Sequence, residues 1–209
     1  MTAPARPASL RQARWIEHVG GVNAPAALRH WLTTGASLTA KLKAHSQAFR
    51  IQRLRQRSGR CLSDEAAAIG LPRAGRVWER EVLLRCDNTP VVYAHTAVPL
   101  AATASDWPLF SALGERSLGS TLFGDPLVRR GELEFARLRA GHPLSERARL
   151  ALGGLNGAGR PLPPEQILYA RRCLYRRHQG LLLVTEVFLP SVLDLVPQNN
   201  TTIMNRNEQ

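Results

Sequence analysis

The fold of this chain is decided near its C-terminus by the run Leu181-Leu182-Leu183-Val184-Thr185-Glu186-Val187-Phe188-Leu189-Pro190. It is the most hydrophobic run in the sequence, and its length predicts a β-strand. Alternate side chains of a strand share one face, which here carries Leu182, Val184, Glu186 and Phe188. Glu186 therefore lies among apolar neighbours, where a carboxylate is costly unless a partner satisfies it. This position is consistent with a functional site, with a structural ion pair, and with a glutamate at a strand edge facing water.

Length and composition indicate one globular domain, because 209 residues with 44% hydrophobic content can bury a sizeable core. The net charge of +12 is a reason to consider nucleic acid as a partner. However, only Lys41 and Lys43 of the 28 basic residues are lysines, and the arginines are spread along the chain. This skew indicates a coding bias, and we find no RNP signature, zinc finger or aromatic–basic interleaving. We therefore predict no nucleic-acid partner, although the positive field still attracts small anions.

The cysteines and histidines argue against a disulfide framework and against a metal site. Cys61, Cys86 and Cys173 lack CxxC spacing, which indicates free thiols in a reducing cytoplasm. The six histidines form no HxxxH or HExxH motif. The longest apolar run is too short to span a bilayer, and residues 1–10 lack the apolar core of a secretory signal. We therefore expect a cytoplasmic protein with no metal and no integral membrane segment.

The hydrophobic pattern along the chain predicts an α+β fold built on an antiparallel sheet. The predicted strands cover residues 49–57, 77–86, 91–98, 132–139, 169–177 and 181–190. Helices are predicted at 25–34, 37–45 and 107–113, with a further helix start at 117–123. Ser37 fits the N-cap of the second helix. The first two helices have the shape of a helix-turn-helix hairpin, but nothing marks a DNA-recognition face.

The domain boundaries follow from composition. We expect residues 1–24, rich in alanine, arginine and proline, to form a loose leader, and residues 25–190 to form a single domain. The glycine- and proline-rich segment 141–165 is predicted to be an exposed, mobile insertion. The polar tail 191–209 is predicted to be disordered.

The predicted strand at 77–86 repeats the anomaly of Glu186. Arg80 shares a face with Trp78, Val82, Leu84 and Cys86, so its permanently charged guanidinium needs an anion there. Its planar fork suits a carboxylate. Arg80 and Glu186 either neutralise each other inside the core or bind an anionic ligand between them. The free backbone amides of the helix start at 117–123 are a further place for an anion, although any helix start offers such amides.

Three segments together resemble the signatures of the chorismate lyase (chorismate pyruvate-lyase) family. They are Trp78–Leu84 (WEREVLL), Ser117–Phe123 (SLGSTLF) and Leu182–Pro190 (LLVTEVFLP). The resemblance runs from about Ala27 to Pro190 in the family's order. It implies a six-stranded antiparallel sheet with helical flaps over an internal ligand site, in a monomer that needs no cofactor. It also implies the elimination of pyruvate from chorismate to give 4-hydroxybenzoate for ubiquinone biosynthesis.

The resemblance also implies roles for four residues. Arg80 matches the arginine that binds the ring carboxylate, and Leu118 matches the residue whose backbone amide helps to hold it. Glu186 matches the acid that contacts the ring hydroxyl, so Glu186 and Arg80 are the predicted catalytic pair. Leu38 takes the place of a backbone contact in the first flap. A buried aromatic product implies product inhibition by 4-hydroxybenzoate. The alternative is a non-catalytic domain of the same fold that senses a small acid.

Overall fold

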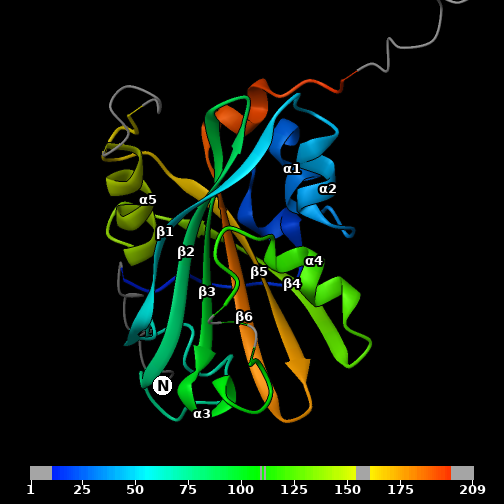
Figure 1. Cartoon of the computed structure of the whole chain (residues 1–209). Coiled ribbons are helices and arrows are strands. Elements are labelled where there is room, and N and C mark those ends of the chain that lie inside the picture. Colours follow the sequence, from blue (N-terminus) through cyan, green and yellow to red (C-terminus); the bar gives the residue numbers. More distant parts are fainter. Residues whose placement is uncertain (1–10, 109, 111, 154–160, 199–209) are drawn as a thin grey trace, which may run out of the picture.

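The computed structural model describes residues 11–108, 110, 112–153 and 161–198, and these form one sheet with helices on both sides (Figure 1). The sheet has six strands in the order β1-β2-β3-β6-β5-β4, and every neighbouring pair is antiparallel. The strands are β1 (Phe49–Arg60), β2 (Arg76–Cys86), β3 (Thr89–Pro99), β4 (Val128–Leu138), β5 (Leu168–Arg177) and β6 (Gly180–Phe188). The predicted α+β class and six-stranded antiparallel sheet are confirmed.

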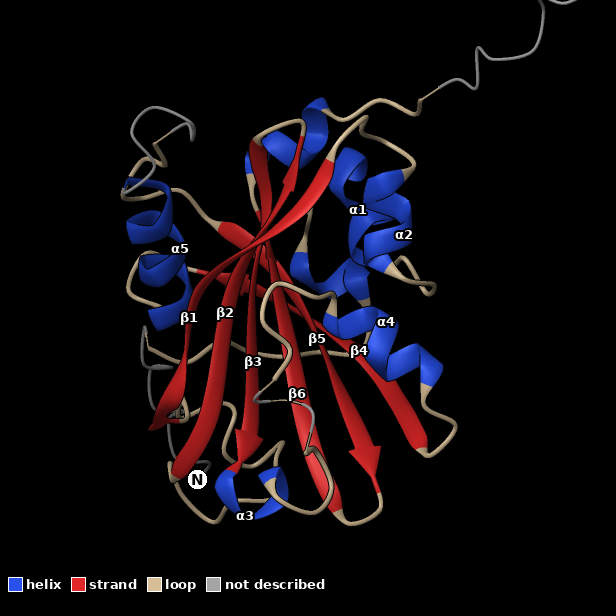
Figure 2. Cartoon of the chain, viewed as in Figure 1, coloured by secondary structure: helices blue, strands red, loops and turns tan. Residues whose placement is uncertain are grey.

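Short helices cover the two faces of this sheet unequally (Figure 2). On one face lie α1 (Ala26–Leu32), α2 (Leu38–Lys43) and α4 (Leu118–Gly124), and on the other lies α5 (Pro143–Gly153). The remaining helical segments are η1 (Val19–Val22), α3 (Leu100–Thr103) and η2 (Pro190–Asp194). We call the side of α1, α2 and α4 the front face and the side of α5 the back face.

The interior strands β2 and β3 are buried on both sides, so the side chains of each strand pack in two environments. Even-numbered side chains such as Val82 and Ala94 pack in the front-face cluster with α1 and α2. Odd-numbered side chains such as Leu83 and Tyr93 pack in the back-face cluster with α5. Because the period of a strand is two, consecutive residues of β2 meet entirely different partners.

The sequence predicts a helix at 107–113, but this prediction is wrong for the described residues, which contain no helix there. The helical turn lies earlier, in α3, which begins directly after Pro99. Trp107, Phe110 and Leu113 are instead buried in a cluster on the front face. Their burial against the sheet, rather than local helix propensity, determines the path of this segment.

Residues 143–153 differ from the exposed, mobile insertion predicted for 141–165, because they form α5. Pro143 is the first helical residue, a position that proline favours. Leu144, Ala148 and Leu152 recur every four residues and are buried against the back face. Most of the glycines and prolines behind the prediction follow this helix, and residues 154–160 lie outside the described part of the chain.

Part of the predicted leader also belongs to the packed structure. Ile16 pairs with Phe135 of β4 through backbone hydrogen bonds of 3.0 and 2.7 Å, and Val22 and Ala24 are buried. At the other end, the backbone N–H of Gln198 donates to the carbonyl of Ala44 at 3.1 Å. Residues 1–10 and 199–209 lie outside the described residues. Among the helices of the described chain, none has the length and apolar character needed to cross a bilayer.

Candidate active site

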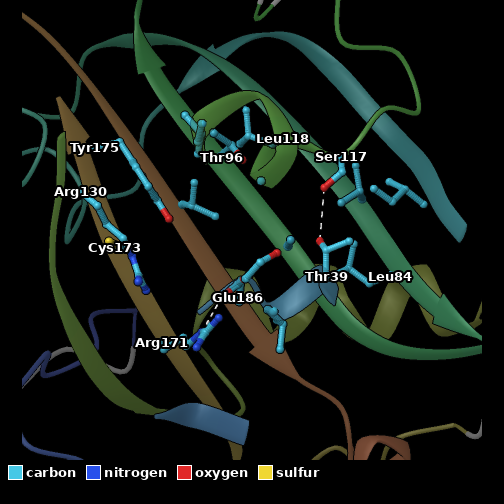
Figure 3. A pocket seen from close by; sticks show the side chains of 18 of the residues that line it. Thr39, Leu84, Thr96, Ser117, Leu118, Arg130, Arg171, Cys173, Tyr175 and Glu186 are labelled. Atoms are coloured by element: carbon cyan, nitrogen blue, oxygen red, sulfur yellow. Dashed lines mark hydrogen bonds and ion pairs between the residues drawn. The ribbon is translucent and has the colours of Figure 1, made fainter. Parts of the chain in front are cut away.

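A pocket on the front face brings together all four site residues that the sequence predicts. Leu38 of α2, Arg80 of β2, Leu118 of α4 and Glu186 of β6 all line it. Its empty volume is about 710 Å³ with its opening to solvent included. Figure 3 looks into this pocket, whose floor is the sheet and whose cover is formed by the first residues of α2 and α4.

Arg80 is buried, with only 2% of its surface exposed, and its partners are neutral. One terminal nitrogen donates to the carbonyls of Gly114 at 2.9 Å and Arg116 at 3.1 Å. Among the described residues, no carboxylate forms an ion pair with it, and its Nε is buried without a hydrogen-bond partner. Burial, together with the charge of Arg53, lowers the pKa of Arg80 to about 10. Arg80 is therefore held in place but still lacks the anion that a buried guanidinium requires.

Arg80 and Glu186 do not neutralise each other. Arg80 is opposite Thr96 on β3, which in turn is opposite Val184 on β6, two residues from Glu186. Two strand spacings and two residues along the strand separate their Cα atoms by about 12 Å in an untwisted sheet. That separation leaves room for one six-membered ring between the two side chains.

Glu186 pairs instead with Arg171, which lies directly opposite on β5. Nε of Arg171 donates to Oε2 of Glu186 at 2.5 Å, and NH1 donates to the carbonyls of Leu32 and Thr34 at 3.2 and 2.7 Å. Arg171 is buried, and Glu186 extends into the pocket (Figure 3). The pair fixes one carboxylate oxygen of Glu186 and leaves its side chain placed to accept a hydrogen bond from a ligand.

The two helices over the pocket are joined at their N-terminal ends. The Ser37 hydroxyl accepts from the N–H of Ala40 at 3.3 Å, which confirms Ser37 as the N-cap of α2. Leu38 and Leu118 are the first residues of α2 and α4, where backbone N–H groups have no partner within the helix. The hydroxyls of Thr39 and Ser117 lie 3.2 Å apart and form a hydrogen bond between the two helices (Figure 3).

Sequence reasoning missed several polar residues of the pocket. They are Thr39, Thr96, Ser117, Arg130, Arg171, Cys173 and Tyr175. One signal was available for β5, because Arg171, Cys173 and Tyr175 alternate along a predicted strand and share one face. The pairing of Arg171 with Glu186 depends on the strand register, which the sequence alone does not provide.

A second group of buried charges lies on the back face, behind the pocket. His95 lies between Glu65 and Glu81, with Nε2 to Oε1 of Glu65 at 3.3 Å and Nδ1 to Oε1 of Glu81 at 3.7 Å. Arg147 of α5 reaches Glu81 at 2.7 Å and Glu79 at 3.2 Å. Burial alone would lower the pKa of His95, but the two glutamates raise it to about 9. Burial would likewise raise the pKa of Glu81, but His95 and Arg147 lower it to about 2.

This back-face network is the place to test for a metal site. Glu79, Glu81 and His95 offer ligand atoms within 4.8 Å of one another. The carboxylates, however, already bind the guanidinium groups of Arg55 and Arg147. These arginines balance the carboxylate charge, so the donor set fits an internal ion-pair network better than a divalent cation.

Comparison with known proteins identifies the family of the chain. The family model for chorismate lyase matches residues 9–196. The chain belongs to this family. A probable chorismate pyruvate-lyase of Ralstonia nicotianae is 50% identical over 163 residues, which are 78% of this chain and 80% of that protein. A probable chorismate pyruvate-lyase of Cupriavidus metallidurans is 44% identical over 191 residues, covering 91% of this chain and 86% of that protein.

Among solved structures, the fold is similar to that of bacterial proteins with much lower sequence identity. PhnF from Mycobacterium smegmatis superposes with a TM-score of 0.54 at 14% identity, covering 76% of this chain and 66% of that one. A GntR-family transcriptional regulator from Bacillus cereus gives 0.50 at 12% identity, covering 75% and 99%. At such identities the likeness establishes the fold of the chorismate lyase chain and nothing about its ligand.

Proposed function

We propose that this chain is a chorismate pyruvate-lyase, which eliminates pyruvate from chorismate and gives 4-hydroxybenzoate for ubiquinone biosynthesis. One observation carries the proposal: Arg80 and Glu186 lie at two ends of one pocket with room for a single ring between them. Membership of the chorismate lyase family supports it, as do curated relatives named probable chorismate pyruvate-lyase.

The proposed substrate pose places the ring between these two side chains. Arg80 binds the ring carboxylate bidentately, and this carboxylate supplies the anion that Arg80 lacks in the free protein. The backbone N–H of Leu118 adds a second donor, and Leu38 provides a backbone contact from α2. Glu186, held by Arg171 at 2.5 Å, accepts a hydrogen bond from the ring hydroxyl. No metal or cofactor is required in this pose.

Orientation and exclusion of water are the main contributions of the protein to the reaction. Loss of pyruvate aromatises the ring, so the driving force lies within the substrate. The ether bond between the ring and the side chain breaks, and the hydrogen of the hydroxyl-bearing ring carbon moves to the side-chain methylene carbon. Pyruvate and 4-hydroxybenzoate then form with no external proton donor. Glu186 acts in this scheme by positioning the hydroxyl.

The test is to incubate the purified protein with chorismate and to measure both products. We expect 4-hydroxybenzoate and pyruvate in equal amounts. The matched control is Arg80→Met, which should form both products much more slowly than the unaltered protein. The product 4-hydroxybenzoate should also inhibit the reaction and raise the melting temperature. A protein that binds 4-hydroxybenzoate but converts no chorismate would instead be a small-acid sensor of the same fold.

We also propose that the enzyme acts in the cytoplasm as a monomer. Its three cysteines, Cys61, Cys86 and Cys173, are buried thiols without disulfide partners, which supports a reducing compartment. The four residues of the proposed pose, Leu38, Arg80, Leu118 and Glu186, line one pocket of this chain, which supports a site built within a single protomer. Light scattering of the purified protein at working concentration tests the oligomeric state.

A further inference from the structure

One arginine reaches the pocket only because β4 is irregular. Arg130 is opposite Tyr175, while Leu133 is opposite Cys173, so the residues between Arg130 and Leu133 form a β-bulge. A regular strand would place side chains three residues apart on opposite faces, yet Arg130 and Leu133 both line the pocket. Bulges often redirect a side chain next to an active site.

A glycine lets the two strands approach closely at the bulge. A Cβ atom added to Gly131 would lie 3.0 Å from the carbonyl oxygen of Leu174 on the neighbouring strand. The Sγ of Cys173 also donates to the Gly131 carbonyl at 3.3 Å. The backbone of β4 therefore approaches β5 closely at the point where it turns Arg130 toward the pocket.

The guanidinium of Arg130 lies at the Glu186 end of the pocket. Its NH1 donates to the carbonyl of Gly35, and NH1 of Arg171 donates to the carbonyl of the preceding residue, Thr34, at 2.7 Å. The two guanidinium groups thus converge on neighbouring carbonyls of the loop between α1 and α2. Figure 3 shows Arg130 extending from β4 toward the Arg171–Glu186 pair.

The charges that line the pocket match a dianion. They are those of Arg80, Arg130, Arg171 and Glu186, which leave a net charge of +2. Glu186 neutralises Arg171, and the ring carboxylate in the proposed pose would neutralise Arg80. Chorismate carries a second carboxylate on its enolpyruvyl side chain, whereas 4-hydroxybenzoate has only one.

We propose that Arg130 binds the carboxylate of the enolpyruvyl side chain, with the Tyr175 hydroxyl beside it. This assignment rests on the proposed function. The side chain is attached next to the hydroxyl-bearing ring carbon, so it lies at the end of the pocket where Glu186 and Arg130 are. Burial, with the charges of Cys173 and Glu186, raises the pKa of Tyr175, which stays a neutral donor.

Arg130 would then distinguish substrate from product. The carboxylate that Arg130 binds leaves with pyruvate, whereas Arg80 and Glu186 bind both chorismate and 4-hydroxybenzoate. Substrate affinity therefore depends on both Arg80 and Arg130, whereas product inhibition depends on Arg80 and not on Arg130.

The experiment compares a stable dianion with a monoanion. The probes are 3-(carboxymethoxy)-4-hydroxybenzoate, whose second carboxylate occupies the place of the side chain, and 4-hydroxybenzoate, both measured by calorimetry. Arg130→Gln should weaken binding of the dianion by about 10- to 100-fold, because a charge-assisted hydrogen bond is lost. Binding of 4-hydroxybenzoate should change less than about threefold. Arg130→Lys should retain part of the preference for the dianion.

The matched control is Arg129→Gln, since Arg129 is the preceding residue of β4 and is exposed. It should change neither affinity. The assignment is wrong if Arg130→Gln weakens the binding of both probes equally, because that result would indicate a loosened loop between α1 and α2. It is also wrong if the substitution weakens the binding of neither probe. Turnover of chorismate by the unaltered protein is measured separately. If the unaltered protein does not turn over chorismate but its binding of the dianion still depends on Arg130, the lyase activity is refuted and the assignment of the subsite stands.

Discussion

Buried charged side chains on the two faces of β2 have opposite kinds of partner. Arg80 points to the front face, where its partners are carbonyl oxygens and its pKa is lowered to about 10. The next residue, Glu81, points to the back face, where His95, Arg55 and Arg147 surround it and its pKa is lowered to about 2. A buried charge that the protein neutralises itself supports the fold. A buried charge left with neutral partners indicates a ligand of opposite sign.

The largest expected effect comes from Arg80→Met on the front face. The value of kcat/KM for chorismate should fall about 100- to 1,000-fold, because truncating one partner of a buried charge pair costs about 2–5 kcal/mol. Stability in urea should be unchanged or higher, since the free protein loses a buried cation without an anion. An equal loss of stability and activity would contradict the distinction between the faces.

Glu81→Gln tests the back face with the adjacent residue of the same strand. We expect it to lower the free energy of unfolding by about 3 kcal/mol, because His95, Arg55 and Arg147 lose a buried counter-charge. Urea denaturation measures the loss, and kcat of the folded fraction should stay near that of the unaltered protein. If Glu81→Gln is less destabilising than Arg80→Met, the back-face network is not structural.

The pH dependence of stability gives a third test. His95 has a folded pKa raised to about 9, above its ordinary value of 6.5. It binds its proton more tightly when folded, so its contribution is complete below pH 6.5 and is lost as pH rises through 9. Unfolding free energy should fall by roughly 3 kcal/mol over this interval on account of His95. His95→Gln should flatten that part of the curve, and an unchanged slope would refute the assignment to His95.

Glu186→Gln examines the other end of the front-face pocket. If Glu186 only positions the hydroxyl, kcat should fall less than about tenfold, because glutamine still accepts a hydrogen bond. Loss of a general acid–base group would instead cost about 100- to 10,000-fold. Stopped-flow assays of chorismate turnover distinguish these ranges, and a loss in the larger range would make Glu186 a proton-transfer group.

The smallest effect concerns the hydrogen bond between the two helices over the pocket. Thr39→Val removes the link to Ser117, which is worth about 1 kcal/mol. Dissociation of 4-hydroxybenzoate should become several-fold faster, and product inhibition should weaken by the same factor. Thr33→Val is the control, because Thr33 is exposed and bonds within its own helix end, to the carbonyl of Arg29. Equal effects of both substitutions would exclude a role for the link in release.

Much of the fold, and the two charged residues of the site, Arg80 and Glu186, were predictable from the alternation of apolar and polar residues. The period of two places Arg80 and Glu186 on buried faces, and the family motifs around them are local runs of sequence. By contrast, the helix expected at 107–113 is replaced by a buried irregular segment, because packing of Trp107 and Phe110 outweighs local propensity. The helix α5 was missed because its apolar repeat is short and precedes a glycine- and proline-rich stretch.

The sequence by itself determined that two opposite charges, Arg80 and Glu186, lie on apolar strand faces, since this follows from local periodicity; Arg80 is buried there and Glu186 is partly exposed. Only the tertiary structure decided that these two side chains do not pair. The strand register across β3 separates them, and Glu186 pairs instead with Arg171. The tertiary structure also decided that Arg130 enters the pocket, through a bulge that breaks the period on which sequence reasoning depends. Register and bulges are properties of strand pairs, so no single strand contains them.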